Sequence, residues 1–238
     1  ELAEHIRLPA SYHEAMSGGG ERWPRVYHFY RRNWGLYDPE MARRYRLMNF
    51  LQIEALDAAL GRFLATLDEL GLYEDALVVF LGDHGEMNCE RALVDKGVYG
   101  HPKTALAPLA VKLPGGEGGG RSLEAPVSLL DVAPTVLELA GVQPADRLDG
   151  ESLLPLLEGE RSRRSAPFIF ECGWHVCPNP AVSWFEEYEG RLFMYTYNLT
   201  SEFDELYDVD DRSYRNLADE PDYAELRAEM IRHLGAFL

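Results

Sequence analysis

Long apolar runs are absent from the 238-residue sequence, and its first residues do not form the apolar segment of a secretory signal. A membrane-spanning helix needs about 20 predominantly apolar residues, so we expect none. The chain also has no initiating Met, and we therefore expect that it begins inside a longer polypeptide. Hydrophobic residues make up 46% and charged residues 26%, which is typical of a globular protein and argues against disorder.

Cysteine is scarce as well, and the three examples are Cys89, Cys172 and Cys177. An odd number at wide spacing does not indicate a disulfide framework, and the absence of a Cys-x-x-Cys pair argues against a zinc site. Cys172 and Cys177 could pair, but free thiols in a reducing compartment are the simpler interpretation. We accordingly expect a cytoplasmic protein.

Positive charge is the third scarce property, because the formal net charge is −17 and the only lysines are Lys96, Lys103 and Lys112. An acidic surface repels polyanions, so we expect neither nucleic acid nor a membrane as a partner. The same surface would repel a sulfate or phosphate ester, and an anionic small-molecule substrate would therefore need a local cation. The composition leaves a homo-oligomer open.

The order of the apolar patterns predicts an α/β fold. Apolar residues recur at three- and four-residue steps between Pro39 and Gly71, which predicts a long helix that ends at the glycine. Ala76–Leu81 and Leu106–Leu113 are unbroken apolar runs, which are typical of parallel strands buried on both faces. A further helix is predicted over Val127–Ala140. Together these elements favour a mixed, mostly parallel sheet between helices.

Three regions follow from these patterns. They are an irregular N-terminal segment over 1–38, an α/β domain over 39–165 and a small C-terminal subdomain over 166–238. In the last region, short strands followed by a helix predict an α+β module. The expected strands and helix are Pro167–Glu171, Leu192–Tyr197, Glu205–Asp208 and Pro221–Phe237.

Asp83 and His84 directly follow the first apolar run. Ligands of open parallel sheets bind beyond the carboxyl ends of the strands, and a carboxylate oxygen beside an imidazole nitrogen can hold one divalent cation. Gly82 and Gly85 flank the pair, and we expect them to allow tight backbone turns. Taken alone, Asp-His-Gly after a strand is more often a simple turn than a metal site.

The wider segment resembles the central part of the sulfatase family, which belongs to the alkaline phosphatase superfamily. In that family a strand ends in Ser-Asp-His-Gly or Ser-Asp-Asn-Gly, and a lysine follows at the distance that separates Asp83 from Lys96. Further stretches match the family in the same order, namely Leu56–Arg62, Gly71–Ala76, Ala107–Gly115, Pro126–Val142, Leu148–Leu157 and Glu205–Ala218. The resemblance implies a three-layer α/β/α fold with a mixed sheet, of which this chain holds the C-terminal half, followed by a small antiparallel module.

The resemblance also implies roles for individual residues. Asp83 and His84 match the family's late metal ligands, for a divalent ion such as calcium, magnesium or manganese. Lys96 matches the lysine that contacts the sulfate or phosphate oxygens, the alternative being a solvated surface lysine; Lys103 is a second candidate. Relatives carry a histidine or an acidic residue near the position of His101, close to the leaving group. An imidazole with a near-neutral pKa could donate a proton there, whereas the alternative is an exposed loop histidine.

The nucleophile of the family is missing from the sequence. Its Cys-x-Pro-Ser-Arg or Ser-x-Pro-x-Arg segment, whose Cys or Ser becomes formylglycine, does not occur. We therefore expect the formylglycine in a missing N-terminal half, which would be a partner of this chain, and we expect the chain alone to be inactive. The parent protein would hydrolyse sulfate esters. A phosphodiester or phosphonate monoester hydrolase and a non-catalytic interaction fragment are the alternatives.

Overall fold

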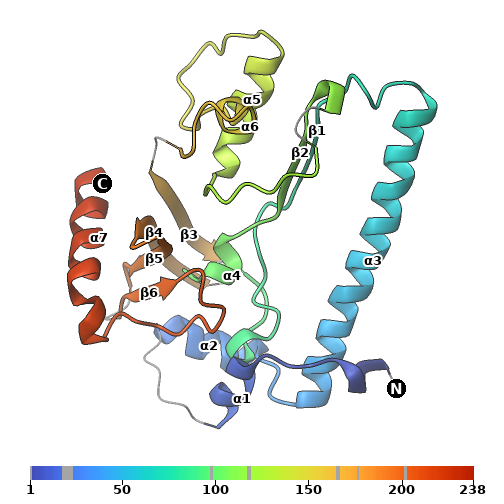
Figure 1. Cartoon of the computed structure of the whole chain (residues 1–238). Helices are drawn as coiled ribbons and strands as arrows, with labels where there is room; N and C mark the ends of the chain where they lie inside the picture. The colour runs from blue at the N-terminus through green and yellow to red at the C-terminus, as the bar shows by residue number, and fades with distance from the viewer. Residues whose placement is uncertain are drawn as a thin grey trace. The chain divides into compact units, whose positions relative to one another are not determined.

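The computed structural model describes residues 2–17, 24–96, 99–116, 119–164, 167–175, 177–200 and 203–238 (Figure 1). Its α-helices are α1 (Ala10–Met16), α2 (Arg25–Trp34), α3 (Pro39–Glu69), α4 (Pro102–Ala105), α5 (Val132–Leu139), α6 (Leu154–Leu157) and α7 (Ala224–Phe237). Its strands are β1 (Val78–Leu81), β2 (Leu109–Lys112), β3 (Phe168–His175), β4 (Cys177–Tyr188), β5 (Arg191–Asn198) and β6 (Glu205–Asp208). Short 3-10 turns lie at Leu2–His5, Glu90–Ala92, Pro114–Gly116, Leu129–Asp131 and Pro221–Tyr223.

The chain forms two compact units, and each is assembled from separate stretches of sequence. Unit 1 comprises Glu1–Ala59, His84–Ala107 and Ile169–Leu238, and unit 2 comprises Leu60–Asp83 and Pro108–Phe168. Among the described helices, none combines the length and the apolar character that crossing a membrane requires.

Helix α3 confirms the predicted long helix, including its stop. Gly71 has a φ of 67°, a left-handed conformation that glycine adopts without steric cost. The amide of Leu72 then donates to the Leu67 carbonyl at 2.9 Å, which closes the helix in the manner of a Schellman motif. Ala42 is the one buried residue of α3, and Ile53, Leu56 and other large apolar side chains are exposed.

The two apolar runs expected in a mostly parallel sheet form β1 and β2, which pair with each other antiparallel. Val78 lies opposite Lys112, and Leu81 lies opposite Leu109. The expected parallel pairing is therefore wrong for these two strands. The expected burial on both faces is also wrong, because every residue of β1 and β2 is half-buried or exposed. A continuous apolar sequence therefore determined neither the burial of these strands nor the direction of their neighbour.

Unit 2 is organised around a buried ion pair between Asp131 and Arg164, whose side chains are 0% and 2% exposed. Arg164 donates to Asp131 from both Nε and Nη2 at 2.8 Å. The same carboxylate accepts the amide protons of Ser128 and Glu151, at 2.9 and 3.0 Å. The Asp131 side chain thus links the start of the Leu129–Asp131 turn, the loop at Glu151 and Arg164, which lies four residues before the start of β3.

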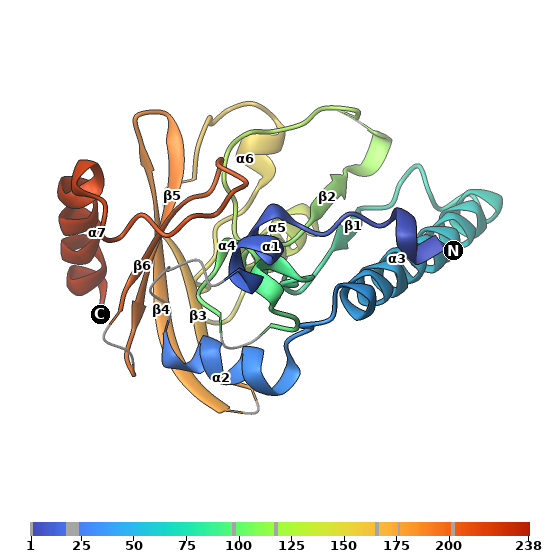
Figure 2. The same ribbon diagram turned by 90° about the horizontal axis from the view of Figure 1, so that it is seen from below.

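Unit 1 contains the small antiparallel module predicted for the C-terminus. Strands β3 to β6 form one sheet in sequence order, and helix α7 lies alongside β4 and β5 (Figure 2). One face of the sheet packs on α7 through Phe193, Tyr195 and Leu206. The other face contacts the His84–Ala107 segment, since Thr196 donates to the Gly100 carbonyl at 2.9 Å. Gly100 is required here, because a Cβ would lie 2.2 Å from the Thr196 methyl carbon.

One prediction for unit 1 is wrong, and one strand was not predicted. The segment 1–38 was expected to be irregular but contains α1 and α2, and the 12-residue strand β4 was not expected at all. Buried Tyr12, Tyr27 and Tyr30 give the N-terminal helices their packing. Of the two cysteines considered for a disulfide, Cys172 is a buried free thiol, and the side chain of Cys177 lies outside the described part of the chain.

The Asp131–Arg164 pair generates a test of unit 2. Replacing Asp131 with Asn removes the buried counter-charge of Arg164, while the contact of its guanidinium with Glu151 at 3.6 Å remains. We expect the free energy of unfolding to fall by about 3–5 kcal/mol. Urea denaturation measures the change. The matched control is Asp149→Asn, at an exposed position of the same unit. Equal stabilities of the two variants would contradict the organising role of the pair.

Candidate functional site

Strand β1 delivers Asp83 and His84 to the end of the β1–β2 pair. The amide of Gly82 donates to the Pro108 carbonyl at 3.0 Å, so the ladder continues one residue beyond Leu81. Both side chains that follow are exposed, with Asp83 as the last residue of its stretch in unit 2 and His84 as the first of its stretch in unit 1. Each is therefore accessible to an ion from solvent.

A hydrogen bond orients the ring of His84, because Nδ1 lies 2.8 Å from the Gly85 carbonyl oxygen. A carbonyl only accepts, so Nδ1 carries the proton of the neutral ring and Nε2 carries the lone pair. A backbone carbonyl on one ring nitrogen is the usual support of a metal-binding histidine. The donor set at this point is thus one carboxylate and one imidazole nitrogen.

Gly85 is required for a reason other than the one predicted. Its φ is not in the left-handed region, so no tight turn depends on it. A Cβ at this position would lie 1.9 Å from the Lys103 carbonyl oxygen and 2.7 Å from that of Leu106. The Gly85 amide also donates to the Thr104 carbonyl at 2.9 Å. The glycine therefore allows the backbone after His84 to pack directly against the α4 region.

Backbone strain is concentrated between His84 and Lys96. Five residues that are not glycine have a positive φ there, namely Asn88, Cys89, Arg91, Ala92 and Asp95. Such conformations cost on the order of 1 kcal/mol each and persist only where the surroundings impose them. Clusters of this kind occur preferentially at functional sites.

Glu86 is the residue that holds this strained loop. Its Oε1 accepts hydrogen bonds from the Asp95 amide at 2.6 Å, the Tyr45 hydroxyl at 2.9 Å and the Asn88 amide at 3.3 Å. Arg46 adds a bond to the Asn88 carbonyl at 2.6 Å. Burial, with the adjacent Glu86 carboxylate, raises the pKa of Tyr45 far above its ordinary value, so the hydroxyl remains a donor. Helix α3 thereby fixes the residue that precedes Lys96.

The two candidate anion contacts have different surroundings. Lys96 Nζ lies 3.2 Å from Asp95 Oδ1, and 39% of its side chain is exposed. Lys103 Nζ lies 3.5 Å from Glu90 Oε1 and 5.2 Å from the centre of the Tyr214 ring. Lys103 is thus part of the packing between the α4 region and the C-terminal module, whereas Lys96 extends from the strained loop.

His101 is buried, so the alternative of an exposed loop histidine is wrong. The residue is 1% exposed, and its ring packs on Tyr207 and Tyr214 at centroid distances of 4.9 and 5.5 Å. Nδ1 accepts the Lys103 amide proton at 3.1 Å, which places the ring proton on Nε2; among the described residues, Nε2 has no hydrogen-bond partner. Burial, and then the charges of Arg91 and Lys103, hold the pKa of His101 well below 6.5. The role of His101 as a proton donor stays a prediction. It was based on a near-neutral pKa, which the buried ring does not have.

A buried polar network beside His101 was not anticipated from the sequence. Glu205, which is 0% exposed, accepts hydrogen bonds from the Tyr27 hydroxyl at 2.9 Å, the Asn198 amide at 3.0 Å and the Tyr207 hydroxyl. Burial raises the pKa of Glu205, although the three donors lower it. The only sequence signal was a glutamate inside a short apolar strand, which is expected to face solvent.

Two family models match the chain, and they overlap. The model described as Sulfatase matches residues 12–142, which include Asp83, His84, Lys96 and His101. The model described as N-sulphoglucosamine sulphohydrolase, C-terminal, matches residues 89–237.

Individual proteins similar to this chain include a sulfatase and a phosphonate monoester hydrolase. The steryl-sulfatase of Mus musculus is 39% identical over 139 residues, covering 52% of this chain and 22% of that protein. The multifunctional alkaline phosphatase superfamily protein PehA of Trinickia caryophylli is 29% identical over 237 residues, covering 94% and 43%. The phosphonate monoester hydrolase of Silicibacter pomeroyi superposes with a TM-score of 0.80 at 21% identity, covering 99% of this chain and 50% of that structure. This likeness confirms the alkaline-phosphatase-like α/β fold, and the chain spans half or less of these relatives.

The Glu86 contacts predict how the loop before Lys96 is held. Glu86→Ala leaves the Asp95 amide and the Tyr45 hydroxyl without their acceptor, and we expect a loss of about 2 kcal/mol of stability. Hydrogen exchange should show the Asp95 amide losing its protection. In the matched variant Tyr45→Phe only one donor is removed, so the loss should be about 1 kcal/mol with the amide still protected. Unchanged exchange at Asp95 in Glu86→Ala would show that other contacts hold the loop.

Burial of neutral His101 predicts a dependence of stability on pH. The unfolded chain binds a proton at this residue below about pH 6.5, and the native chain does not, so stability should fall as the pH is lowered through that value. The slope approaches about 1.4 kcal/mol per pH unit. Urea denaturation between pH 7.5 and 5.5 should show this slope for the wild type and for His13→Gln, at an exposed position. His101→Gln should lose most of it, with a smaller slope of the same sign left by His28, whose pKa burial also lowers. The same slope in all three proteins would exclude His101 as the cause.

Proposed function

Because this chain belongs to the sulfatase family, we propose that it contributes the late metal ligands and the anion contact to an enzyme that hydrolyses sulfate esters. The observation that carries the proposal is the family match over residues 12–142, a range that includes Asp83, His84 and Lys96. The steryl-sulfatase likeness supports a sulfate ester as the small-molecule substrate.

The donors at the end of β1 fit a divalent metal ion. Asp83 would supply a carboxylate oxygen, and His84 would supply Nε2, whose lone pair is set by the hydrogen bond from Nδ1 to the Gly85 carbonyl. An oxygen and a nitrogen donor together suit manganese, while further carboxylates would favour calcium or magnesium. When bound, such an ion polarises the ester and stabilises negative charge on the nucleophile.

Lys96 would provide the local positive charge that an anionic ester requires in a protein of net charge −17. Its ammonium group can neutralise charge on the oxygens of the transferred group, where negative charge develops in the transition state. The loop that carries it is held by Glu86, so the lysine begins from a fixed backbone position. We assign His101 a positioning role behind this loop, with proton donation as the alternative.

The nucleophile would come from residues outside the 238-residue sequence, which contains no Cys-x-Pro-x-Arg segment. In the sulfatase family that residue is a formylglycine. Helix α3 supports the presence of a covering partner, since Ile53, Leu56 and Phe63 are 54–61% exposed on a helix of 31 residues. The proposed occupant of this surface is the N-terminal half of the same protein, and the chain alone would be inactive.

A phosphonate monoester or a phosphodiester is the second candidate substrate. The structural likeness to a phosphonate monoester hydrolase and the 29% identity to PehA over 94% of this chain favour it. Sulfate and phosphonate groups share tetrahedral oxygens, and Lys96 would contact either. The choice between them depends on the nucleophile and on the substrate pocket.

The two lysines provide a matched test in the complete enzyme. We expect Lys96→Ala to lower kcat for 4-nitrophenyl sulfate by about 100- to 1000-fold, because it removes charge stabilisation from the transition state. Lys103→Ala, which removes a packing contact, should change kcat less than about tenfold. Equal effects of the two variants would contradict the role of Lys96, and faster turnover of a phenylphosphonate monoester would select the second candidate. Equal, negligible metal content in the wild type and in Asp83→Ala would instead favour a non-catalytic interaction module.

A further inference from the structure

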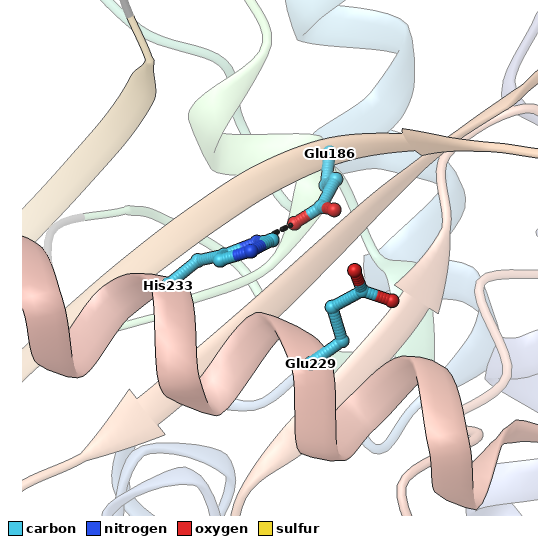
Figure 3. A group of neighbouring side chains, drawn as sticks. All are labelled: Glu186, Glu229 and His233. Carbon is cyan, nitrogen blue, oxygen red and sulfur yellow. Dashed lines mark hydrogen bonds and ion pairs between the residues drawn. The ribbon is translucent and has the colours of Figure 1, made fainter.

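A second group of metal-ligating side chains lies on the C-terminal module. Glu186 is on β4, and Glu229 and His233 are on α7, one helical turn apart (Figure 3). One ligand atom from each residue lies within 4.8 Å of the other two. Figure 3 shows both helix residues projecting toward Glu186. The family match gives these residues no role in the hydrolysis proposed above.

The geometry is already close to that of a bound ion. Residues four apart on a helix lie on the same face, so α7 presents a carboxylate and an imidazole as a preformed pair. The third side chain approaches from the sheet, where His233 Nδ1 lies 2.8 Å from Glu186 Oε2. Two ligands of one zinc ion, each about 2.1 Å from it, are about 3.4 Å apart, so small side-chain rotations suffice.

The charges at this point are not balanced by protein groups. Glu186 and Glu229 are partly buried carboxylates, and His233 is the one basic side chain that pairs with Glu186 in the described part of the chain. Within the same residues Glu229 forms no ion pair. Two neighbouring carboxylates repel each other, and a cation between them relieves that repulsion.

Trp184 orients the sheet ligand. Its indole Nε1–H donates to Glu186 Oε2 at 3.0 Å, and its ring centroid lies 6.1 Å from that of His233. An outer hydrogen bond of this kind fixes the direction of a ligating carboxylate. It also places a fluorescent side chain beside the group.

We propose that Glu186, Glu229 and His233 form a binding site for a divalent transition-metal ion, with zinc as the best fit. Two carboxylate oxygens and one imidazole nitrogen form a mixed set that zinc binds tetrahedrally, with water as the fourth ligand. Calcium requires six or more oxygens and fits poorly. The ion would join α7 to β4 on the face of the sheet that carries Phe193 and Leu206 and packs on α7. The opposite face contacts Gly100 and His101.

Zinc titration of the 238-residue chain tests the proposal, and isothermal titration calorimetry and Trp fluorescence are used to measure binding. Asp83→Ala is used as the background, so that only the C-terminal group is measured. We expect one zinc ion per chain, a rise in Tm on binding and an affinity that falls at least about tenfold in His233→Gln and in Glu229→Gln. Glu225→Gln, at an exposed position of the same helix, should bind as the background protein does.

Circular dichroism and Tm without metal establish that each variant is folded, which is expected because His233 is exposed and Glu229 is partly buried. Cobalt provides an independent readout, since visible absorption bands with nitrogen ligation should appear in the Asp83→Ala protein and vanish in His233→Gln. Equal zinc affinity in the background protein, His233→Gln and Glu229→Gln would overturn the proposal, as would the absence of zinc binding in all of them. Neither outcome depends on sulfate-ester hydrolysis.

Discussion

The hydrogen bonds to one oxygen of Glu86 are the constraint on which the geometry of the proposed sulfate-ester site depends. Asp95, Tyr45 and Asn88 all donate to this oxygen. The loop from Glu86 to Asp95 contains five residues that are not glycine and have a left-handed backbone conformation. Short peptides avoid this conformation, so contacts with the rest of the protein must impose it. Helix α3 provides these contacts through Tyr45 and Arg46, and the long helix therefore acts as the scaffold for the loop.

Features that depend on residues close in sequence were predicted, and features that depend on residues far apart in sequence were not. Helix α3 and strand β6 were predicted nearly to the residue, because periodicity and a terminal glycine are local signals. Strand β4 was missed, since Pro178 and Pro180 argue against a strand and only pairing with β3 and β5 makes it one. The adjacency of Asp83 and His84 was visible in the sequence. The roles of Glu86 and Glu205 were not, because each also depends on a tyrosine hydroxyl that is distant along the chain.

The chain neutralises its buried carboxylates in two ways, which matters for a protein of net charge −17. Asp131 is paired with the charged guanidinium of Arg164, and both side chains are buried. Glu205 is held by neutral tyrosine and asparagine donors instead, and burial raises its pKa. The charge of Arg91 lowers the pKa of Glu205 only as the last of several causes, so this acid depends mainly on its hydrogen bonds.

The bond between Tyr27 and Glu205 joins residues 178 positions apart in the sequence. Closing so long a loop costs chain entropy before any contact is gained, whereas β4, β5 and β6 pair with their sequence neighbours. The C-terminal meander can therefore fold early, and α2 must dock on it late. The buried tyrosines of α1 and α2 pack against residues between Ala42 and Tyr99, so during synthesis these helices leave the ribosome before that surface exists. The Tyr27–Glu205 bond of unit 1 can form only after β6 has been made.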